Sequence, residues 1–587
     1  MFPPEQTLAA RNSLTAAMTV IAGAAFGCAL AGLISDRNSV LISSYFFAVQ
    51  DAPVLLLLGL FLAVLVTLLK RDVAKSAIGA IEPRRAMHFA WIAVAIGCCI
   101  IWAGSFLVYR NFGLSMDEFM AEFDAGIIAT GKLVAAVAPD WRAYVPALQP
   151  IFRLELPDNA YWSSAYLPMN AAIRAVFVLF GAPALEGVVL AAIAIIALFG
   201  VARRLWPDRP DAAVVAIILL VCSSQFLITA MTPYAMTAHL ALNMAWLWLF
   251  LRDTRAAHVL AAGVAFVACG LHQVVFHPLF AAPFVVSLLL ARRWKLAAHY
   301  ITVYGVIGLF WILYWTFVLR AVSVPVAQSA DLGMLHFFAH VATLVDLSPA
   351  GFFFMGVNLL RFLAWQTPIL IPLAVVGLLA GHEQNQNRTN LALAAGIALT
   401  LAAMLVLMPY QGHGWGYRYL HGFLGSLALI AAQGWIWVTG RGTQASRAPA
   451  LAVLLSALGS LFVLLPWQAY QVHAFVNPYA SAVAAIEHSG AEVVIVDPTD
   501  IWFGEDLVRN DPFLRTAPKV LSLPRLDETR LSELCRRGDV AIFDREDAQR
   551  LGMRIVQSQP DMVNQDRKLR TAARSLGCGR PVSVSRS

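Results

Sequence analysis

The chain has 587 residues, of which 59% are hydrophobic and only 13% are charged, and its mean hydropathy is +0.69. A soluble protein of this length would be near a quarter charged, so the composition excludes an ordinary soluble enzyme and predicts an integral membrane protein. The net charge of +7 indicates no nucleic-acid partner, because the basic residues lie in short loops between apolar segments and report membrane topology.

Apolar windows of about 20 residues recur along the chain, and this is the length that an α-helix needs to cross a bilayer. Thirteen such windows are recognised, and each is expected to be a membrane-spanning helix. They lie at about 14–34, 53–69, 86–108, 183–202, 211–230, 235–251, 257–272, 274–291, 299–319, 365–380, 391–408, 419–438 and 449–467. Because the first window is long enough to span and others follow it, no cleavable signal peptide is expected.

The basic residues predict the orientation of the chain. Seventeen Lys and Arg residues lie before the first window or in alternate loops, whereas the intervening short loops hold few. Positively charged loops stay in the cytoplasm, so we expect a cytoplasmic N-terminus in a plasma (inner) membrane. The loops at about 109–182, 320–364 and 409–418 and the residues after 467 would then all be extracytoplasmic.

The two long extracytoplasmic loops are predicted to contain helices that rest in the membrane interface. In the first loop, Asp117–Val137 and Met169–Phe180 are too short or too polar to span but have apolar faces. In the second loop, Leu332–Val345 and Gly351–Leu363 have the same character. Together these helices would cover a cavity at the membrane surface, where a lipid-linked substrate can bind.

Residues 468–587 are predicted to form a small soluble α/β domain, because the chain becomes more polar there. Glu492–Asp497 and Val540–Asp544 have the pattern of buried strands, and Leu526–Arg537 has the pattern of a helix. The last 20 or so residues, which are rich in Ser, Arg and Gly, are expected to be disordered.

Five of the seven cysteines lie in apolar segments and are expected to be small core residues. Cys535 and Cys578 lie in the C-terminal domain. In an oxidising compartment they would be able to form a disulfide, and the sequence leaves their pairing open.

An acidic cluster begins the first long loop, a few residues after the third window ends. Because the third span ends only a few residues earlier, Asp117 and Glu118 are expected to lie at the membrane surface. An ionised carboxylate there can act as a general base. If this segment is helical, Asp117, Ala121 and Asp124 share one face, while Glu118 and Glu122 share another. The alternative is a solvated acidic helix start, which is favourable at a helix N-terminus.

These features together resemble the GT-C glycosyltransferases, and most of all the bacterial branch that includes aminoarabinose transferases and protein O-mannosyltransferases. The resemblance covers about residues 86–440. It is carried by Asp117-Glu118 at the start of the loop, by the interfacial helices and by Ser164-Ala165-Tyr166-Leu167-Pro168 before the next span. It implies an all-α polytopic membrane protein with about 13 transmembrane helices and a small C-terminal extracytoplasmic α/β domain. The implied reaction moves a sugar from a polyprenyl-phosphate donor to a glycan, lipid or protein acceptor, with inversion.

Two residue roles follow from the resemblance: Asp117 would be the catalytic base and Glu118 a supporting carboxylate. The sequence also departs from the family in two ways. Two spans precede the one that leads into the acidic loop, and no Lys-Pro-Pro tripeptide stands where some members place a phosphate-contacting lysine. The second departure leaves the phosphate ligand open.

Candidates for that ligand lie in the segment from Tyr410 to His421, whose glycines allow close backbone approach. Arg418, at the mouth of a span, can present a fork of donors to phosphate oxygens, and Tyr417 and His413 lie in the same segment. The succession Gly-Trp-Gly and Arg-Tyr resembles segments of GT-C-like proteins. The alternative is an arginine that reaches the lipid headgroups.

Further candidates are two histidines and three aromatic residues. His272 and His277 lie where two predicted spans meet on the outer face, and they would bind the phosphate or the acceptor. The alternative is that they are helix-end histidines hydrogen-bonded to backbone carbonyls. Tyr166, Trp162 and Trp415 are candidates for contact with a sugar, and the alternative for such residues is an interfacial aromatic belt.

No resident cofactor is expected, because no tight group of His or carboxylate residues is visible, although relatives that use pyrophosphate donors can employ divalent cations. Two other classes of function are kept as alternatives, a lipid or glycan transporter and a scaffold for envelope assembly. The spans have almost no charged residues near their centres, which counts against coupled transport.

Overall fold

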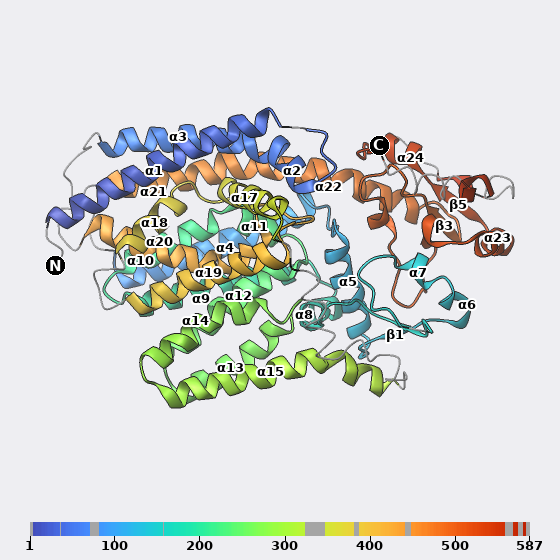
Figure 1. Cartoon of the computed structure of the whole chain (residues 1–587), viewed down its shortest axis with the longest axis horizontal. Coiled ribbons are helices and arrows are strands. Elements are labelled where there is room, and N and C mark those ends of the chain that lie inside the picture. Colours follow the sequence, from blue (N-terminus) through green and yellow to red (C-terminus); the bar gives the residue numbers. More distant parts are fainter. Residues whose placement is uncertain are drawn as a thin grey trace.

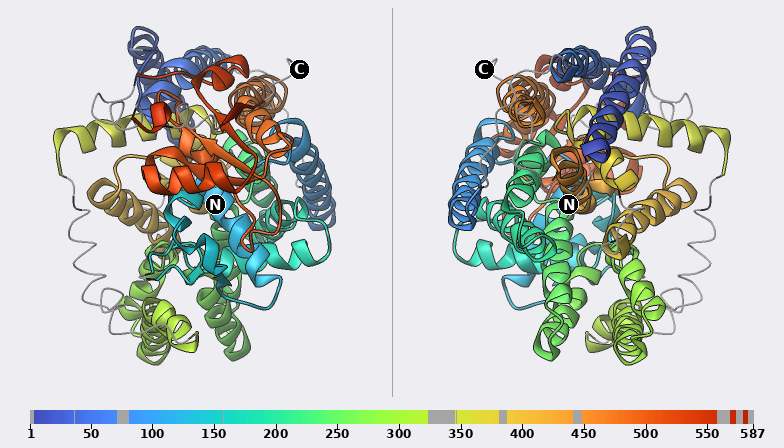
Figure 2. Two further views of the ribbon diagram at one scale, coloured as in Figure 1. Left: turned by 90° about the vertical axis from the view of Figure 1, so that its right-hand side faces the viewer. Right: turned by 90° about the vertical axis from the view of Figure 1, so that its left-hand side faces the viewer.

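The computed structural model describes residues 4–35, 37–70, 81–156, 158–322, 345, 347–380, 387–440, 448–557, 568–572 and 579–582. Long apolar helices form an elongated bundle (Figure 1). The polar segments and a small sheet gather at one end, and the first helix begins at the other. Figure 2 shows the molecule along the bundle from each of these ends. The protein is a polytopic helical membrane protein with a small C-terminal α/β unit, as the sequence predicts.

Helices cover all thirteen predicted windows. They are α1 (Pro4–Leu33), α3 (Ala52–Lys70), α4 (Pro83–Leu107), α9 (Leu185–Leu205), α10 (Pro210–Val221), α12 (Ala235–Arg252), α13 (Arg255–Cys269), α14 (Phe276–Leu290), α15 (Trp294–Ala321), α18 (Leu370–Ala380), α19 (Asn387–Leu407), α20 (Leu424–Thr439) and α21 (Ala448–Gly459). Within the described ranges, eight helical segments are long and apolar enough to cross a membrane. The other five windows fall on α10, α12, α13, α14 and α18, which have 11 to 18 residues.

Helix α20 lies in the interior of the bundle: within the span Arg418–Thr439, which contains it, 94% of an 18-residue apolar stretch is buried. It packs against α10, α18 and α19. Gly377 of α18 and Gly434 of α20 let the two backbones touch, because a Cβ added at either would run into a carbonyl oxygen of the other helix. Small residues at such crossings are typical of membrane helices, whose association depends on close packing.

Helices are present in three of the four stretches for which the sequence predicts interfacial helices. They are α5 (Met116–Ile128), α8 (Met169–Leu179) and α17 (Pro349–Ala364). The first is shorter than the predicted 117–137, because the chain turns at Gly131 (φ +78°) and then forms strand β1 (Ala135–Ala136), which pairs with β2 (Tyr161–Trp162). The helix expected at Leu332–Val345 lies, apart from its last residue, outside the described residues.

The C-terminal unit is a parallel sheet of order β4-β3-β5-β6. Its strands are β3 (Val493–Val496), β4 (Lys519–Ser522), β5 (Val540–Phe543) and β6 (Arg580–Pro581), and its helices include α23 (Glu528–Arg537) and α24 (Arg545–Arg550). The run Val-Val-Ile-Val of β3 is buried throughout, as is usual for a central parallel strand. Helix α22 (Leu465–Glu487) leads into the sheet from the bundle and passes through residue 468, where the domain is expected to begin.

The cysteines divide as the sequence suggests. The five in apolar segments are free thiols, whereas Cys535 of α23 is disulfide-bonded. Cys578, its candidate partner, lies outside the described residues.

Candidate functional site

Helix α5 begins with a capping box that fixes the direction of the two acidic residues. The Glu118 backbone N–H donates to Ser115 Oγ, and Ser115 N and Oγ donate to Glu118 Oε2 at 2.6 and 2.8 Å. The other oxygen of Glu118 accepts from the Thr232 hydroxyl, which lies between α11 (Ser224–Thr229) and α12. Glu118 is therefore turned back into the protein, and it anchors α5 to the bundle. Burial raises the pKa of its carboxyl above the usual range, although hydrogen bonds from Thr232 and Ser115 oppose this.

Asp117 points the other way and meets Arg418. Its Oδ2 lies 2.6 Å from Arg418 Nη1, and its Oδ1 accepts from the Tyr166 hydroxyl. The Tyr166 ring in turn stacks on His272, with ring centroids 4.2 Å apart. Four side chains from four distant segments of the chain thus converge on one point.

The electrostatics of this cluster keep Asp117 ionised. Burial raises the pKa of Asp117, but Arg418, His272 and the hydrogen bond from Tyr166 together lower it more, so that it lies below its ordinary value. Burial lowers the pKa of His272 to about 4, so its ring is neutral at pH 7. At neutral pH the site therefore holds a carboxylate, a guanidinium and a neutral imidazole.

Arg418 is held by the glycine-rich segment that precedes it. Its backbone N–H donates to Gln411 Oε1 at 2.9 Å, and Gln411 Nε2 donates to the Gly416 carbonyl at 3.0 Å. Gly416 has a φ of +62°, and a Cβ there would meet Gln225 Oε1 at 2.5 Å. Both the backbone conformation and the space therefore require glycine at this position.

A buried ion pair, Arg361–Asp51, also anchors the glycine-rich segment before Arg418. Arg361 of α17 contacts Asp51 (Nε–Oδ2 2.9 Å) and donates from Nη2 to the Gly414 carbonyl at 2.8 Å, while Trp365 Nε1 donates to Asp51 Oδ1. Asp51 is the last residue of the π-helical turn η1 (Phe47–Asp51) before α3. Sequence reasoning missed this pair, and its signal was a charged residue at the edge of each of two apolar segments.

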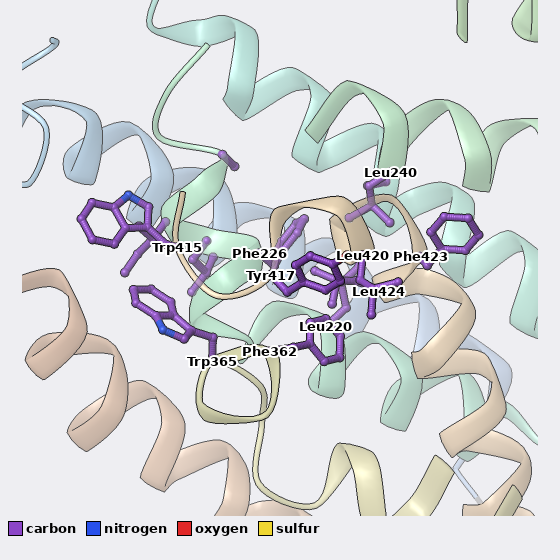
Figure 3. Packing of buried hydrophobic residues seen from close by; sticks show 14 of the residues in the cluster. Leu220, Phe226, Leu240, Phe362, Trp365, Trp415, Tyr417, Leu420, Phe423 and Leu424 are labelled. Carbon is purple, nitrogen blue, oxygen red and sulfur yellow. The ribbon is translucent and has the colours of Figure 1, made fainter. Parts of the chain in front are cut away.

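Aromatic side chains of the segment fill the adjacent core (Figure 3). Tyr417 lies in the buried cluster near Phe226, and Trp415 lies beside Trp365 at the edge of that cluster. Trp415 Nε1 also donates to the Tyr109 hydroxyl, and its ring stacks on Trp365 at 5.9 Å. These buried rings fix the course of the segment up to Arg418, which begins the 3-10 helix η5 (Arg418–Phe423).

Two adjoining narrow cavities border the Asp117–Arg418 pair and share Met236 and His272 in their walls. One is also lined by Asp117, Asp124 and Tyr166, and the other by Arg418. Each cavity is therefore bordered by one member of the ion pair.

Asp124 lies on the same face of α5 as Asp117 and anchors the segment that carries Tyr166. It accepts hydrogen bonds from Ser163 Oγ and Ser164 N, both at 3.0 Å, and from the Ser164 hydroxyl. Burial raises the pKa of Asp124 to about 6, although these hydrogen bonds oppose the shift. The predicted shared face of Asp117, Ala121 and Asp124 is present, since all three line one cavity.

Other residues selected from the sequence lie apart from this cluster. His277 bonds Asn243 Oδ1 (2.7 Å) and the Tyr304 hydroxyl (3.0 Å) between helices. Trp162 is 1% exposed and donates from Nε1 to the Pro512 carbonyl at 2.7 Å. These two residues, Tyr417, Trp415 and His413 do not line the two cavities beside Asp117 and Arg418. The structure brings together Asp117, Arg418, Tyr166 and His272 from the predicted set.

Three residues that line the cavity beside Arg418 have buried polar atoms without hydrogen-bond partners among the described residues. Arg418 Nε, His272 Nδ1 and both ring nitrogens of His239 are buried and have no hydrogen-bond partner within the described part of the chain. His239, on α12, was missed from the sequence, although a histidine inside an apolar window is a signal of function. Unpaired buried donors are costly, so their convergence on one cavity indicates a place for a polar ligand.

The described residues contain no group of three or more His, Cys, Asp or Glu side chains arranged to hold a metal ion. The donor set around Arg418 consists of two imidazoles and a guanidinium, which suits an anion.

Comparison with known proteins gives structural matches only. No family model and no curated protein matches the sequence. The chain is similar to the crystal structure of ArnT from Cupriavidus metallidurans bound to undecaprenyl phosphate, with a TM-score of 0.48 and 13% identity over 84% of this chain and 89% of that chain. It is also similar to apo ArnT from the same organism (TM-score 0.48, 14% identity, 78% and 93% of the two chains).

Proposed function

We propose that this protein is a membrane-embedded glycosyltransferase of the GT-C type. It would move a sugar from a polyprenyl-phosphate donor to an extracytoplasmic glycan, lipid or protein acceptor. Asp117 would be the base, and Arg418 would bind the donor phosphate. Glu118 would act only indirectly, by holding α5 in place.

The free edge of the Arg418 guanidinium is the observation that carries this proposal. Nη1 is engaged by Asp117, Nη2 makes only a 3.4 Å contact with the Tyr419 hydroxyl, and Nε has no partner among the described residues. Nε and Nη2 form the pair of donors that a guanidinium uses to bind two phosphate oxygens. His272 and His239 would add N–H donors from the cavity wall.

The proposed reaction is one displacement at the anomeric carbon. An acceptor hydroxyl gives its proton to Asp117 while its oxygen bonds to that carbon, and the bond from the carbon to the phosphate oxygen breaks. The electron pair leaves with the phosphate, whose charge Arg418 stabilises. Attack opposite the leaving group inverts the anomeric centre. No step of this displacement requires a metal ion.

The setting of the site supports a lipid-borne donor. Asp117 lies ten residues after the end of α4, a helix apolar enough to span, and Arg418 begins another such segment. A phosphate at Arg418 would therefore lie near the membrane surface, with its prenyl chain among the helices. We also propose that this end of the bundle is extracytoplasmic, in line with the distribution of Lys and Arg.

The proposal is tested with the full-length protein in lipid nanodiscs. Undecaprenyl-phosphate monosaccharides are supplied with a membrane glycolipid extract as acceptor, and release of undecaprenyl phosphate is followed by mass spectrometry. The wild type should release it, and Asp117→Asn should lower turnover about a hundredfold or more. Asp140→Asn, a change at an exposed carboxyl of the same loop, should have no effect. A wild type that binds these lipids but releases no product would indicate a transporter or scaffold.

A further inference from the structure

A short segment of the C-terminal unit, residues 506–512, contacts the two segments that carry Asp117 and Arg418. One contact reaches the start of α5, which carries Asp117. The other reaches the glycine-rich segment that holds Arg418. Neither contact involves the reacting groups themselves.

Arg509 makes the first contact. Its Nη2 donates to the Leu114 carbonyl at 2.8 Å, immediately before the Ser115 cap of α5. Its guanidinium also lies over the rings of Phe112 (4.1 Å to the centroid) and Phe119 (5.2 Å). Arg509 therefore joins the C-terminal unit to the residues on both sides of the capping box.

Asp506 makes the second contact. Its Oδ2 lies 3.2 Å from His413 Nε2, a close approach without the geometry of a hydrogen bond, and both side chains are at least nine-tenths buried. The His413 ring also packs on Phe503, with centroids 4.1 Å apart. His413 lies between Gln411, which accepts from the Arg418 backbone, and Gly414, which accepts from Arg361.

The two contacts belong to one fixed piece of structure. Arg509 Nε donates to the Asp506 carbonyl at 2.9 Å, which links the two residues directly. Asn510 exchanges hydrogen bonds with the Val520 backbone of β4 (2.7 and 2.8 Å) and also donates to the Leu148 carbonyl (2.8 Å). The spacing between the two contacts is thus set by the sheet and is not free to vary with the membrane helices.

We propose that Asp506 and Arg509 are positioning residues through which the C-terminal unit holds Asp117 and Arg418 in register. The catalytic consequence rests on the proposed function, whereas the mechanical link does not. Because a displacement of about 1 Å at a reacting group can cost a hundredfold in rate, such a brace would matter even though it touches no substrate.

Hydrogen exchange of the full-length protein in nanodiscs tests the mechanical link. Arg509→Gln should speed exchange of the amides at 114–120, and Asp506→Asn should speed exchange at 411–418. Two control variants break ion pairs within the C-terminal unit and should leave hydrogen exchange unchanged in both segments. They are Asp500→Asn, which removes the ion pair with Arg545, and Arg525→Gln, which removes the ion pair with Glu505. Unchanged exchange in both segments of both variants would overturn the proposal. If exchange also rises in β3, the unit itself has opened, and Asp506→Glu and Arg509→Lys replace those variants.

Kinetics test the consequence for the reaction. Asp506→Asn and Arg509→Gln should lower kcat at least tenfold and move the acid limb of the pH–rate profile to higher pH. The reason is that Asp117 keeps its burial but loses part of the influence of Arg418, while His272, Tyr166 and Tyr234 still face it. A mere loss of stability would leave the acid limb in place. An unchanged kcat and an unchanged pH–rate profile would contradict the proposal. An inactive wild type would count against the proposed function, and the hydrogen-exchange result would then decide whether Asp506 and Arg509 are positioning residues.

Discussion

Arg418 and Asp117 form an ion pair with an N–O distance of 2.6 Å although 301 residues separate them in the chain. A capped helix positions Asp117, and a glycine-rich turn positions Arg418. A buried pair of this kind is weak support for a role in stability, because desolvation offsets much of the attraction. Its place beside a cavity with unpaired donors points to a substrate instead.

Replacing Arg418 should affect both donor binding and the charge state of Asp117. Arg418→Ala should raise the KM for the donor at least tenfold. It should also shift the acid limb of kcat/KM to higher pH, because the pKa of Asp117 is held down by Arg418 against burial. The measurement is kcat/KM as a function of pH. Arg110→Ala, at an exposed arginine of the same end that bonds Asn477 and Ser481, should leave both quantities unchanged. Equal profiles for the Arg418 variant and the wild type would contradict the assignment.

Tyr166→Phe should lower kcat about tenfold with little change in thermal stability. The variant loses the hydroxyl that donates to Asp117 but keeps the ring that stacks on His272. Single-turnover kinetics and a melting curve provide the comparison, with Tyr161→Phe of β2 as the control. A large fall in Tm with unchanged kcat would show that the hydroxyl serves packing alone.

Glu118→Ala should destabilise the protein by about 1–3 kcal/mol, because it leaves buried partners at Ser115 and Thr232 unpaired and removes half of the capping box. Thermal unfolding followed by tryptophan fluorescence measures this. Turnover per folded molecule should fall far less than in Asp117→Asn. The control is Glu487→Ala, at an exposed residue of α22. If Glu118→Ala instead keeps its Tm and loses turnover as fully as the Asp117 variant, Glu118 takes part in the chemistry.

Asp124 should make stability depend on pH between about 4 and 6. Its pKa is raised from 3.8 to about 6 in the folded protein, so the folded state holds a proton that the unfolded state has released. Stability from this group is therefore lost as the pH rises through that window, by up to about 3 kcal/mol. Asp124→Asn should flatten this part of the curve of Tm against pH. A parallel displacement of the whole curve would show that Asp124 stays ionised.

The broad architecture could be predicted because it depends on local signals. Long apolar windows, the Ser115–Glu118 spacing of the capping box and the buried strand pattern at Val493–Val496 all depend on neighbouring residues. The same holds for the shared face of Asp117 and Asp124, which follows from helical periodicity alone.

The site could be predicted only in part, because its partners come from distant segments. Trp162 and Trp415 matched the pattern of sugar-binding aromatics, yet their indole N–H groups are engaged by Pro512 and Tyr109. The pairing of Arg361 with Asp51 depends on how α17 packs on the bundle, which no local pattern reports. The part played by His239 likewise becomes visible only when its unpaired nitrogens are seen beside Arg418.

The most direct test of the central claim is a structure of the protein in nanodiscs with undecaprenyl phosphate bound. We predict that the phosphate oxygens lie within hydrogen-bond distance of Arg418 Nε and Nη2, in the cavity that His239 and His272 line, with Asp117 beside them. A phosphate bound at another surface, with that edge of Arg418 still empty, would contradict the account.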